Sequence, residues 1–107
     1  MNDHVIVVGG GPSGLSAAIE LRRRGVERVT VFEREREAGG VPRHTDHLGF
    51  GMRDLHRLMT GPRYARRLVT AAEHAGVQLR TSTTVAHVSG SGVILVDGSP
   101  IDAGAVI

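Results

Sequence analysis

Three glycines near the start of the chain, Gly9, Gly11 and Gly14, have the spacing Gly-x-Gly-x-x-Gly. They follow an apolar run at residues 5–8, which is typical of a buried strand, and precede a segment of helical periodicity. This combination can hold the pyrophosphate of a dinucleotide, because the unpaired N–H groups and the dipole of a helix N-terminus attract an anion. The first glycine permits a sharp turn, the second lets phosphate approach the backbone, and the third lets helix and strand pack closely.

An acidic residue follows at the offset that such a site requires. Residues 29–32 predict a second strand, and Glu33 comes directly after it, 24 positions beyond Gly9. A carboxylate roughly 20 residues after the first glycine accepts hydrogen bonds from ribose hydroxyls and disfavours a 2′-phosphate. The sequence therefore predicts NAD or FAD as the ligand rather than NADP. Further candidate contacts lie next to these residues: Pro12, Ser13 and Arg34.

The elements that position these residues follow from periodicity and from turn residues. The expected strands are residues 4–8, 29–32 and 77–80, all parallel, and the expected helices are residues 12–24, 53–59 and 62–75. Gly25 and Gly76 follow two of these helices in the position of a C-terminal cap. Apolar residues on the last helix predict a buried stripe, and its arginines face outward. The stripe comprises Ala65, Leu68, Val69, Ala72 and Ala75, and the arginines are Arg63, Arg66 and Arg67.

The last part of the chain predicts a small antiparallel meander. Its expected strands are residues 84–88, 93–96 and 103–107, joined by turns at residues 89–92 and 97–100. The predicted fold is thus α/β, a Rossmann-like βαβ unit with a small antiparallel β-meander. In this arrangement the first strand lacks a neighbour on one side, and such an apolar edge invites association.

Length and composition restrict the functional classes. A chain of 107 residues is enough for one small domain. The absence of Cys excludes disulfides and thiolate metal sites, and no apolar run approaches the ~18 residues of a membrane span. The N-terminus has no signal-peptide pattern, so the cytoplasm is the expected location.

The charge is unevenly distributed. All 13 basic residues are Arg, and residues 41–80 hold seven Arg against three acids. A basic stretch can bind nucleic acid, but one Tyr and two Phe offer no stacking platform. A solvated helix face near an anionic cofactor is the preferred interpretation, and no nucleic-acid partner is expected.

A loop of the middle region carries polar residues with two interpretations each. His44, Asp46 and His47 are metal-ligand types, but residues so close in an irregular loop cannot easily converge on one ion, and no fourth ligand is evident. We expect no metal site. Arg43 is either a bidentate donor to the pyrophosphate or a surface residue.

Residues 5–25 with Glu33 and the doublet Gly39-Gly40 resemble the FAD-binding start of the two-dinucleotide-binding-domain flavoproteins. The resemblance implies FAD as the cofactor, a close approach of the chain to it at Gly40, and a backbone contact from Val85 to the adenine. Residues 40–47 and 61–67, together with Gly51, resemble the branch of dehydrogenases that act on amino acids, opines, other amines or glycerol phosphate. Disulfide reductases of this family carry a Cys pair, which this chain lacks.

The same resemblance implies that residues 1–107 are a partial FAD-binding domain, a Rossmann-like FAD/NAD(P)-binding fold that is incomplete at the C-terminus. The family's later Ala-Thr-Gly and Gly-Asp motifs, and a substrate or second dinucleotide domain, are absent from these residues. The chain would then be part of an FAD-dependent oxidoreductase, completed by a missing C-terminal part or a partner subunit. The alternatives are a non-catalytic nucleotide-binding or interaction module that docks on a partner subunit, and an NAD-only domain. No residue is predicted to be catalytic.

Overall fold

The structure, a computed structural model, describes residues 3–40 and 61–107. Two helices and seven strands lie in these ranges, and the predicted helix at residues 53–59 lies outside them. The elements are β1 (His4–Val8), α1 (Pro12–Arg23), β2 (Arg28–Phe32), α2 (Gly61–His74), β3 (Gln78–Arg80), β4 (Val85–Ser89), β5 (Gly92–Leu95), β6 (Pro100–Asp102) and β7 (Ala105–Val106).

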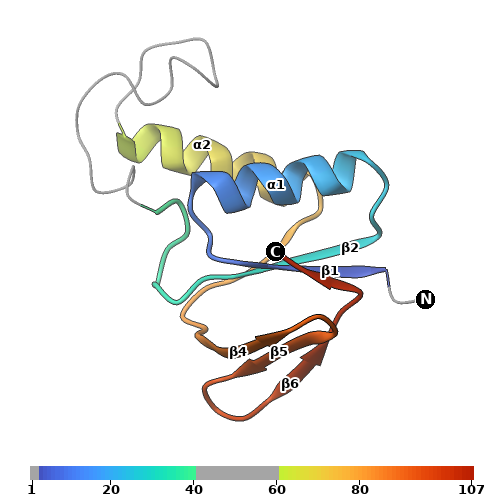
Figure 1. The fold of residues 1–107 in the computed structure, drawn as a ribbon. Helices are drawn as coiled ribbons and strands as arrows, with labels where there is room; N and C mark the ends of the chain where they lie inside the picture. The colour runs from blue at the N-terminus through green and yellow to red at the C-terminus, as the bar shows by residue number, and fades with distance from the viewer. Residues whose placement is uncertain (1–2, 41–60) are drawn as a thin grey trace.

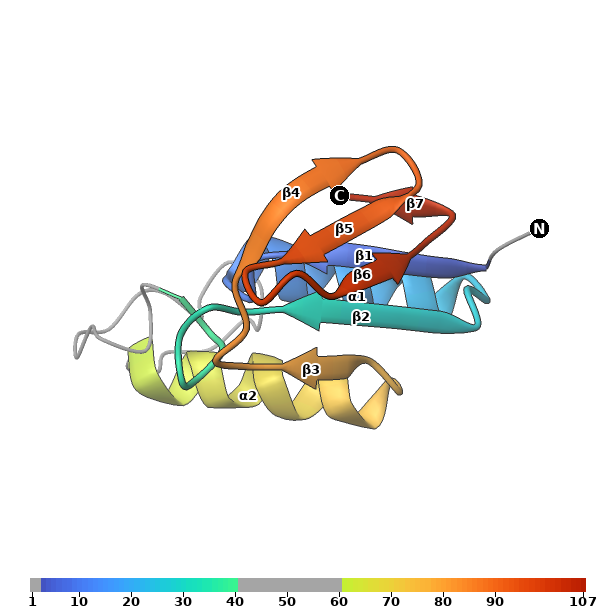
Figure 2. The same cartoon turned by 90° about the horizontal axis from the view of Figure 1, so that it is seen from below.

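The described chain forms three layers (Figure 1). A parallel sheet with strand order β3-β2-β1-β7 lies in the middle, and both helices cover one of its faces. The antiparallel sheet β4-β5-β6 covers part of the other face (Figure 2). The α/β class, the parallel βαβ unit and the separate meander predicted from the sequence are therefore confirmed.

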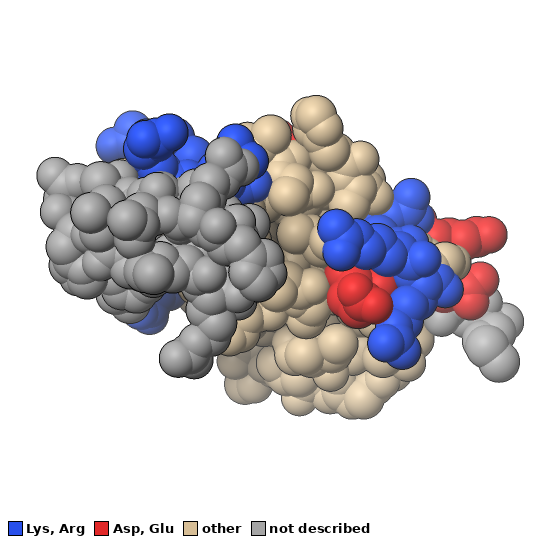
Figure 3. Space-filling model, turned by 90° about the horizontal axis from the view of Figure 1, so that it is seen from above, with Lys and Arg blue, Asp and Glu red and all other residues tan. Residues whose placement is uncertain are grey.

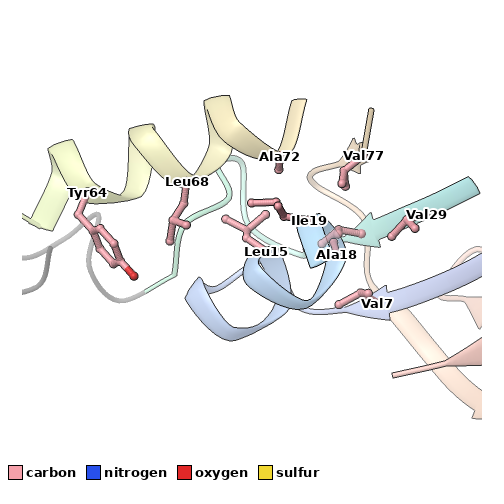
Figure 4. Close-up of a cluster of buried hydrophobic side chains, with 10 residues drawn as sticks. Val7, Leu15, Ala18, Ile19, Val29, Tyr64, Leu68, Ala72 and Val77 are labelled. Atoms are coloured by element: carbon pink, nitrogen blue, oxygen red, sulfur yellow. The ribbon is translucent and has the colours of Figure 1, made fainter. Parts of the chain in front are cut away.

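Two hydrophobic cores hold the layers together, because alternate residues of β1 and β2 point to opposite faces of the sheet. Between the sheet and the helices, Val7 and Val31 pack with Leu15 and Leu68. Figure 4 shows the side chains of the two helices pointing toward one another in this core. Between the sheet and the meander, Ile6 packs in a second core whose other buried members are Phe32, Val93, Leu95 and Ala103.

The buried stripe of α2 largely agrees with the prediction. Ala65, Leu68 and Ala72 are buried, and Val69 and Ala75 are partly buried. Tyr64 is an additional core residue, only 2% exposed, which the sequence pattern did not reveal. The three predicted outward arginines are exposed.

Both helices end at the predicted glycines. After α1, Gly25 has φ +95, its N–H donates to the Arg22 carbonyl, and the Val26 N–H donates to the Leu21 carbonyl. This is a Schellman motif, which requires a left-handed residue at the position of Gly25. The same pair of bonds follows α2, where Gly76 has φ +90.

Arg22 joins the end of α1 to the end of α2. Its Nε donates to the Ala75 carbonyl at 2.9 Å, and its Nη1 donates to the carbonyls of Val26 and Glu27 at 2.7 and 2.6 Å. One guanidinium group thus donates to three main-chain carbonyls at or just beyond the ends of the two helices.

The prediction for residues 103–107 was wrong. The third strand of the meander is β6, and β7 instead joins the parallel sheet beside β1. The Ile107 N–H donates to the Ile6 carbonyl, and the Val8 N–H donates to the Ile107 carbonyl. The predicted open edge of β1 is therefore also wrong, because β7 pairs with it.

A polar row crosses the parallel sheet near the N-terminal end of β1. His4 is 5% exposed, its Nε2 lies 2.7 Å from Thr30 Oγ1, and its Nδ1 lies 3.1 Å from the Asp102 carbonyl oxygen. The Thr30 hydroxyl lies 3.0 Å from Gln78 Oε1. Burial, partly offset by the hydrogen bond to Asp102, lowers the pKa of His4.

Candidate dinucleotide-binding site

The glycine loop between β1 and α1 has the geometry that its spacing predicts. Gly9 has φ +103, which favours glycine, and its N–H donates to the Phe32 carbonyl at 2.8 Å. A Cβ at Gly14 would overlap the Gly9 carbonyl oxygen and lie 3.3 Å from Val7 Cγ1. Gly14 therefore allows α1 to pack directly on the end of β1.

The N-terminus of α1 is open to an anion. Gly11 is its N-cap and provides no side-chain cap, Pro12 occupies the first turn, and that turn holds no acidic residue. Among the described residues, a Cβ at Gly11 would meet only Gly40 Cα, 4.0 Å away, so these residues leave space in front of this backbone. Ser13 is exposed at the same helix end. Main-chain N–H groups and the helix dipole thus point into accessible space, as phosphate binding requires.

Glu33 lies directly beside this loop. Its side chain is buried, with 8% of the residue exposed. Oε1 accepts the Gly10 N–H at 2.8 Å, and Oε2 accepts the Glu35 N–H at 2.7 Å. A carboxylate offers about four acceptor sites, so each oxygen retains capacity for one further donor. The two hydroxyls of one ribose can donate hydrogen bonds to such a carboxylate.

The glycine doublet packs against the loop. The Gly39 N–H donates to the Gly10 carbonyl at 2.6 Å, and Gly39 and Gly40 have φ of +117 and +64. A Cβ at Gly40 would lie 2.9 Å from Gly11 Cα and 3.2 Å from Pro12 Cδ. Gly40 is therefore needed for close packing of two backbone segments, a reason that the sequence resemblance does not supply.

Residues after β3 complete the surroundings of Glu33. The Glu33 N–H donates to the Arg80 carbonyl, and the Thr83 N–H donates to the Glu33 carbonyl, both at 2.9 Å. Ser82, with φ +49, donates its N–H to the Glu35 carbonyl at 2.7 Å. Val85 begins β4 two residues after Thr83, so the segment expected to reach the adenine lies next to the acid expected to reach the ribose.

The remaining predicted residues lie elsewhere or outside the described ranges. Arg34 is exposed, with its Nε 3.9 Å from Glu35 Oε1. Arg43, like His44, Asp46 and His47, falls outside the described residues. Gly10, which sequence reasoning did not select, is the residue whose N–H and carbonyl connect Glu33 and Gly39. Its only sequence signal is that it makes Gly9-Gly10-Gly11 an uninterrupted run of three glycines.

The arginines of the described residues do not gather into one surface patch on the part of the helix side that these residues form. Figure 3, which looks onto the helices, shows basic side chains in separate groups, some of them next to acidic ones. Arg24 and Glu20 form one such pair at 3.0 Å. In the part of the chain that the structure describes, no helix is long and apolar enough to cross a membrane. Residues 3–40 and 61–107 also hold no group of three or more possible metal ligands.

Comparisons with known proteins agree with this geometry. Over 45 residues the chain is 53% identical to the flavin-containing monooxygenase FMO GS-OX-like 4 of Arabidopsis thaliana, covering 42% of this chain and 10% of that protein. Over 59 residues it is 48% identical to the all-trans-zeta-carotene desaturase of Myxococcus xanthus, covering 55% and 10%. The matched segment thus spans about a tenth of these two relatives.

A solved structure extends the likeness to nearly the whole fold. The structure of CtdE in complex with FAD and a substrate has a TM-score of 0.74 and 20% identity, covering 96% of this chain and 36% of that one. Residues 7–75 match the family model of the NAD(P)-binding Rossmann-like domain. This match covers well over half of the chain and includes the glycine loop and Glu33, and the chain therefore belongs to the family of NAD(P)-binding Rossmann-like domains.

Proposed function

We propose that this chain binds FAD and is the FAD-binding part of a flavin-dependent oxidoreductase. The pyrophosphate would lie against Gly11, Ser13 and Gly14 at the start of α1, and the adenosine ribose against Glu33. Further contacts with FAD are proposed for six other residues: Gly9, Pro12, Arg34, Gly40, Arg43 and Val85.

One observation carries the proposal. The buried Glu33 carboxylate lies one hydrogen bond, 2.8 Å, from the peptide of the glycine loop, with acceptor capacity left on both oxygens. An open helix N-terminus and an acceptor for a diol thus occur side by side. A dinucleotide carries both groups that these features can bind, a pyrophosphate and a ribose diol. A 2′-phosphate on that ribose would be repelled by the negative charge of Glu33.

Two names among the relatives favour FAD over NAD. One relative is a flavin-containing monooxygenase, and one neighbour was solved with FAD. When bound, the flavin supplies hydride chemistry, and the described residues supply binding and orientation. For the whole protein we propose hydride transfer from a small amine, amino acid or hydroxy substrate, which the resemblance of residues 40–47 and 61–67 supports.

A non-catalytic nucleotide-binding module that docks on a partner subunit is the second candidate. The matched segment covers 10% of each of two relatives, which is compatible with part of a larger enzyme and with a separate module. Detection of substrate-dependent flavin reduction in the protein that contains these residues would support the enzyme. Flavin binding without reduction by any amine, amino-acid or hydroxy-acid substrate would favour the module.

A titration with FAD tests the binding proposal. The purified protein is titrated while flavin absorbance and fluorescence are followed, with NAD as a competitor. We expect saturable FAD binding that NAD does not displace, and a loss of at least tenfold in affinity for Glu33→Ala. Glu37→Ala removes an exposed acid from the same segment and serves as the matched control. Equal affinity of Glu33→Ala and wild type would refute the assignment of Glu33 to the ribose.

A further inference from the structure

The Gly10 peptide lies where three segments of the site meet. Its N–H donates to Glu33 Oε1 at 2.8 Å, and its carbonyl accepts the Gly39 N–H at 2.6 Å. The other oxygen of Glu33 accepts the Glu35 N–H at 2.7 Å. One carboxylate therefore connects the glycine loop, the turn after β2 and, through Gly10, the glycine doublet.

Both partners of each of these bonds belong to this chain. They are charge-assisted bonds to a buried group, which belong to the stronger class of hydrogen bonds in proteins. Without the carboxylate, the Gly10 N–H would lose its acceptor in a buried position, since Gly10 is buried as well. An unpaired buried donor is costly, so the loop would shift to find another partner.

We propose that Glu33 is a positioning residue for the glycine loop, in addition to its proposed contact with the ribose. It fixes the Gly10 peptide and thereby the backbone of Gly11, which caps α1, before a cofactor arrives. The part of this inference that concerns cofactor affinity rests on the proposed function; the part that concerns the ligand-free loop does not.

The substitution Glu33→Gln separates the two roles. Glutamine retains nearly the same shape but offers one acceptor oxygen, and its NH2 group would face an N–H donor on the other side. It can therefore satisfy the Gly10 N–H or the Glu35 N–H, but not both. Glu33→Asp keeps the charge but is shorter by one methylene, which provides a second variant. Glu37→Gln, at an exposed acid, is the matched control.

The first measurement is amide hydrogen exchange by NMR in the ligand-free protein. We expect protection of the Gly10 or the Glu35 amide to fall at least tenfold in Glu33→Gln and in Glu33→Asp. Protection of the Val31 amide, within β2, should change little. Glu37→Gln should match wild type at all three amides. Unchanged protection at Gly10 and Glu35 would overturn the proposal, as would an equal loss at Val31, which would indicate general destabilisation.

The second measurement uses FAD and its analogue that lacks both hydroxyls of the adenosine ribose. If Glu33 acted only on the ribose, Glu33→Gln and wild type would bind the analogue equally, and the proposal would be wrong. If Glu33 also positions the loop, the variant should bind the analogue at least fivefold more weakly. Failure of wild type to bind FAD at all would refute the proposed function, whereas the exchange measurement would still decide whether Glu33 positions the loop.

Discussion

Replacement of Gly14 by Ala tests the packing of α1 on β1. The new Cβ would overlap the Gly9 carbonyl oxygen and lie 3.3 Å from Val7 Cγ1. Because the overlapped atom is main chain at the sharp turn, neither side can move without disturbing the loop. Overpacking of this kind costs about 3 kcal/mol. Alanine is favoured over glycine in a helix by about 1 kcal/mol, so a net loss of about 2 kcal/mol is expected.

Thermal unfolding followed by far-UV circular dichroism measures this loss. For a domain of this size, about 2 kcal/mol corresponds to a decrease of about 8 °C or more in Tm. Gly90→Ala is the matched control, because a Cβ at Gly90, in the turn between β4 and β5, would meet no atom of the described residues within 4 Å. A Tm for Gly14→Ala that equals that of the control would refute the close contact between Gly14 and Gly9.

Two further predictions concern stability. Arg22→Ala removes hydrogen bonds to three main-chain carbonyls and should lower the free energy of unfolding by about 2 kcal/mol in urea titrations, whereas Arg23→Ala, at an exposed neighbour, should change it little. If Arg22→Ala lowers the free energy of unfolding no more than Arg23→Ala does, the three hydrogen bonds do not contribute to stability. Burial lowers the pKa of His4 from its usual 6.5, so between the two pKa values the folded chain binds fewer protons there than the unfolded chain. The contribution of His4 to the free energy of unfolding should therefore be constant above about pH 6.5. As the pH falls below that value, this contribution should decrease. In urea titrations between pH 7.5 and 5, His4→Gln should reduce this slope and His87→Gln, at an exposed site, should not; equal slopes in both variants would contradict the prediction.

The sequence predicted those features whose cause is local. Gly9, Gly14 and Gly25 each have a backbone requirement that the neighbouring residues reveal, namely a turn, a close contact and a helix end. The position of Glu33 follows from the length of one βαβ unit. These features do not depend on distant parts of the chain, so spacing alone was enough to predict them.

The features that the sequence did not reveal depend on tertiary pairing. β7 has only two residues, Ala105 and Val106, and nothing in so short a segment distinguishes a meander strand from a strand of the parallel sheet. Its placement results from burial of Ala103 in the second core and from the Gly104 N–H, which donates to the His4 carbonyl. Likewise, a carboxylate in the sequence does not reveal that each of its oxygens accepts one main-chain N–H, from Gly10 and from Glu35.

The pairing of β7 with β1 has a consequence for the order of folding. β1, α1 and β2 are contiguous, so their contacts close short loops and can form early. The second edge of β1 is satisfied only by residues about 100 positions later, as in the bond from the Gly104 N–H to the His4 carbonyl. During synthesis, one side of the first strand therefore stays exposed until almost all of these residues have left the ribosome. Premature strand pairing at that side is therefore a misfolding route open to nascent chains of this protein.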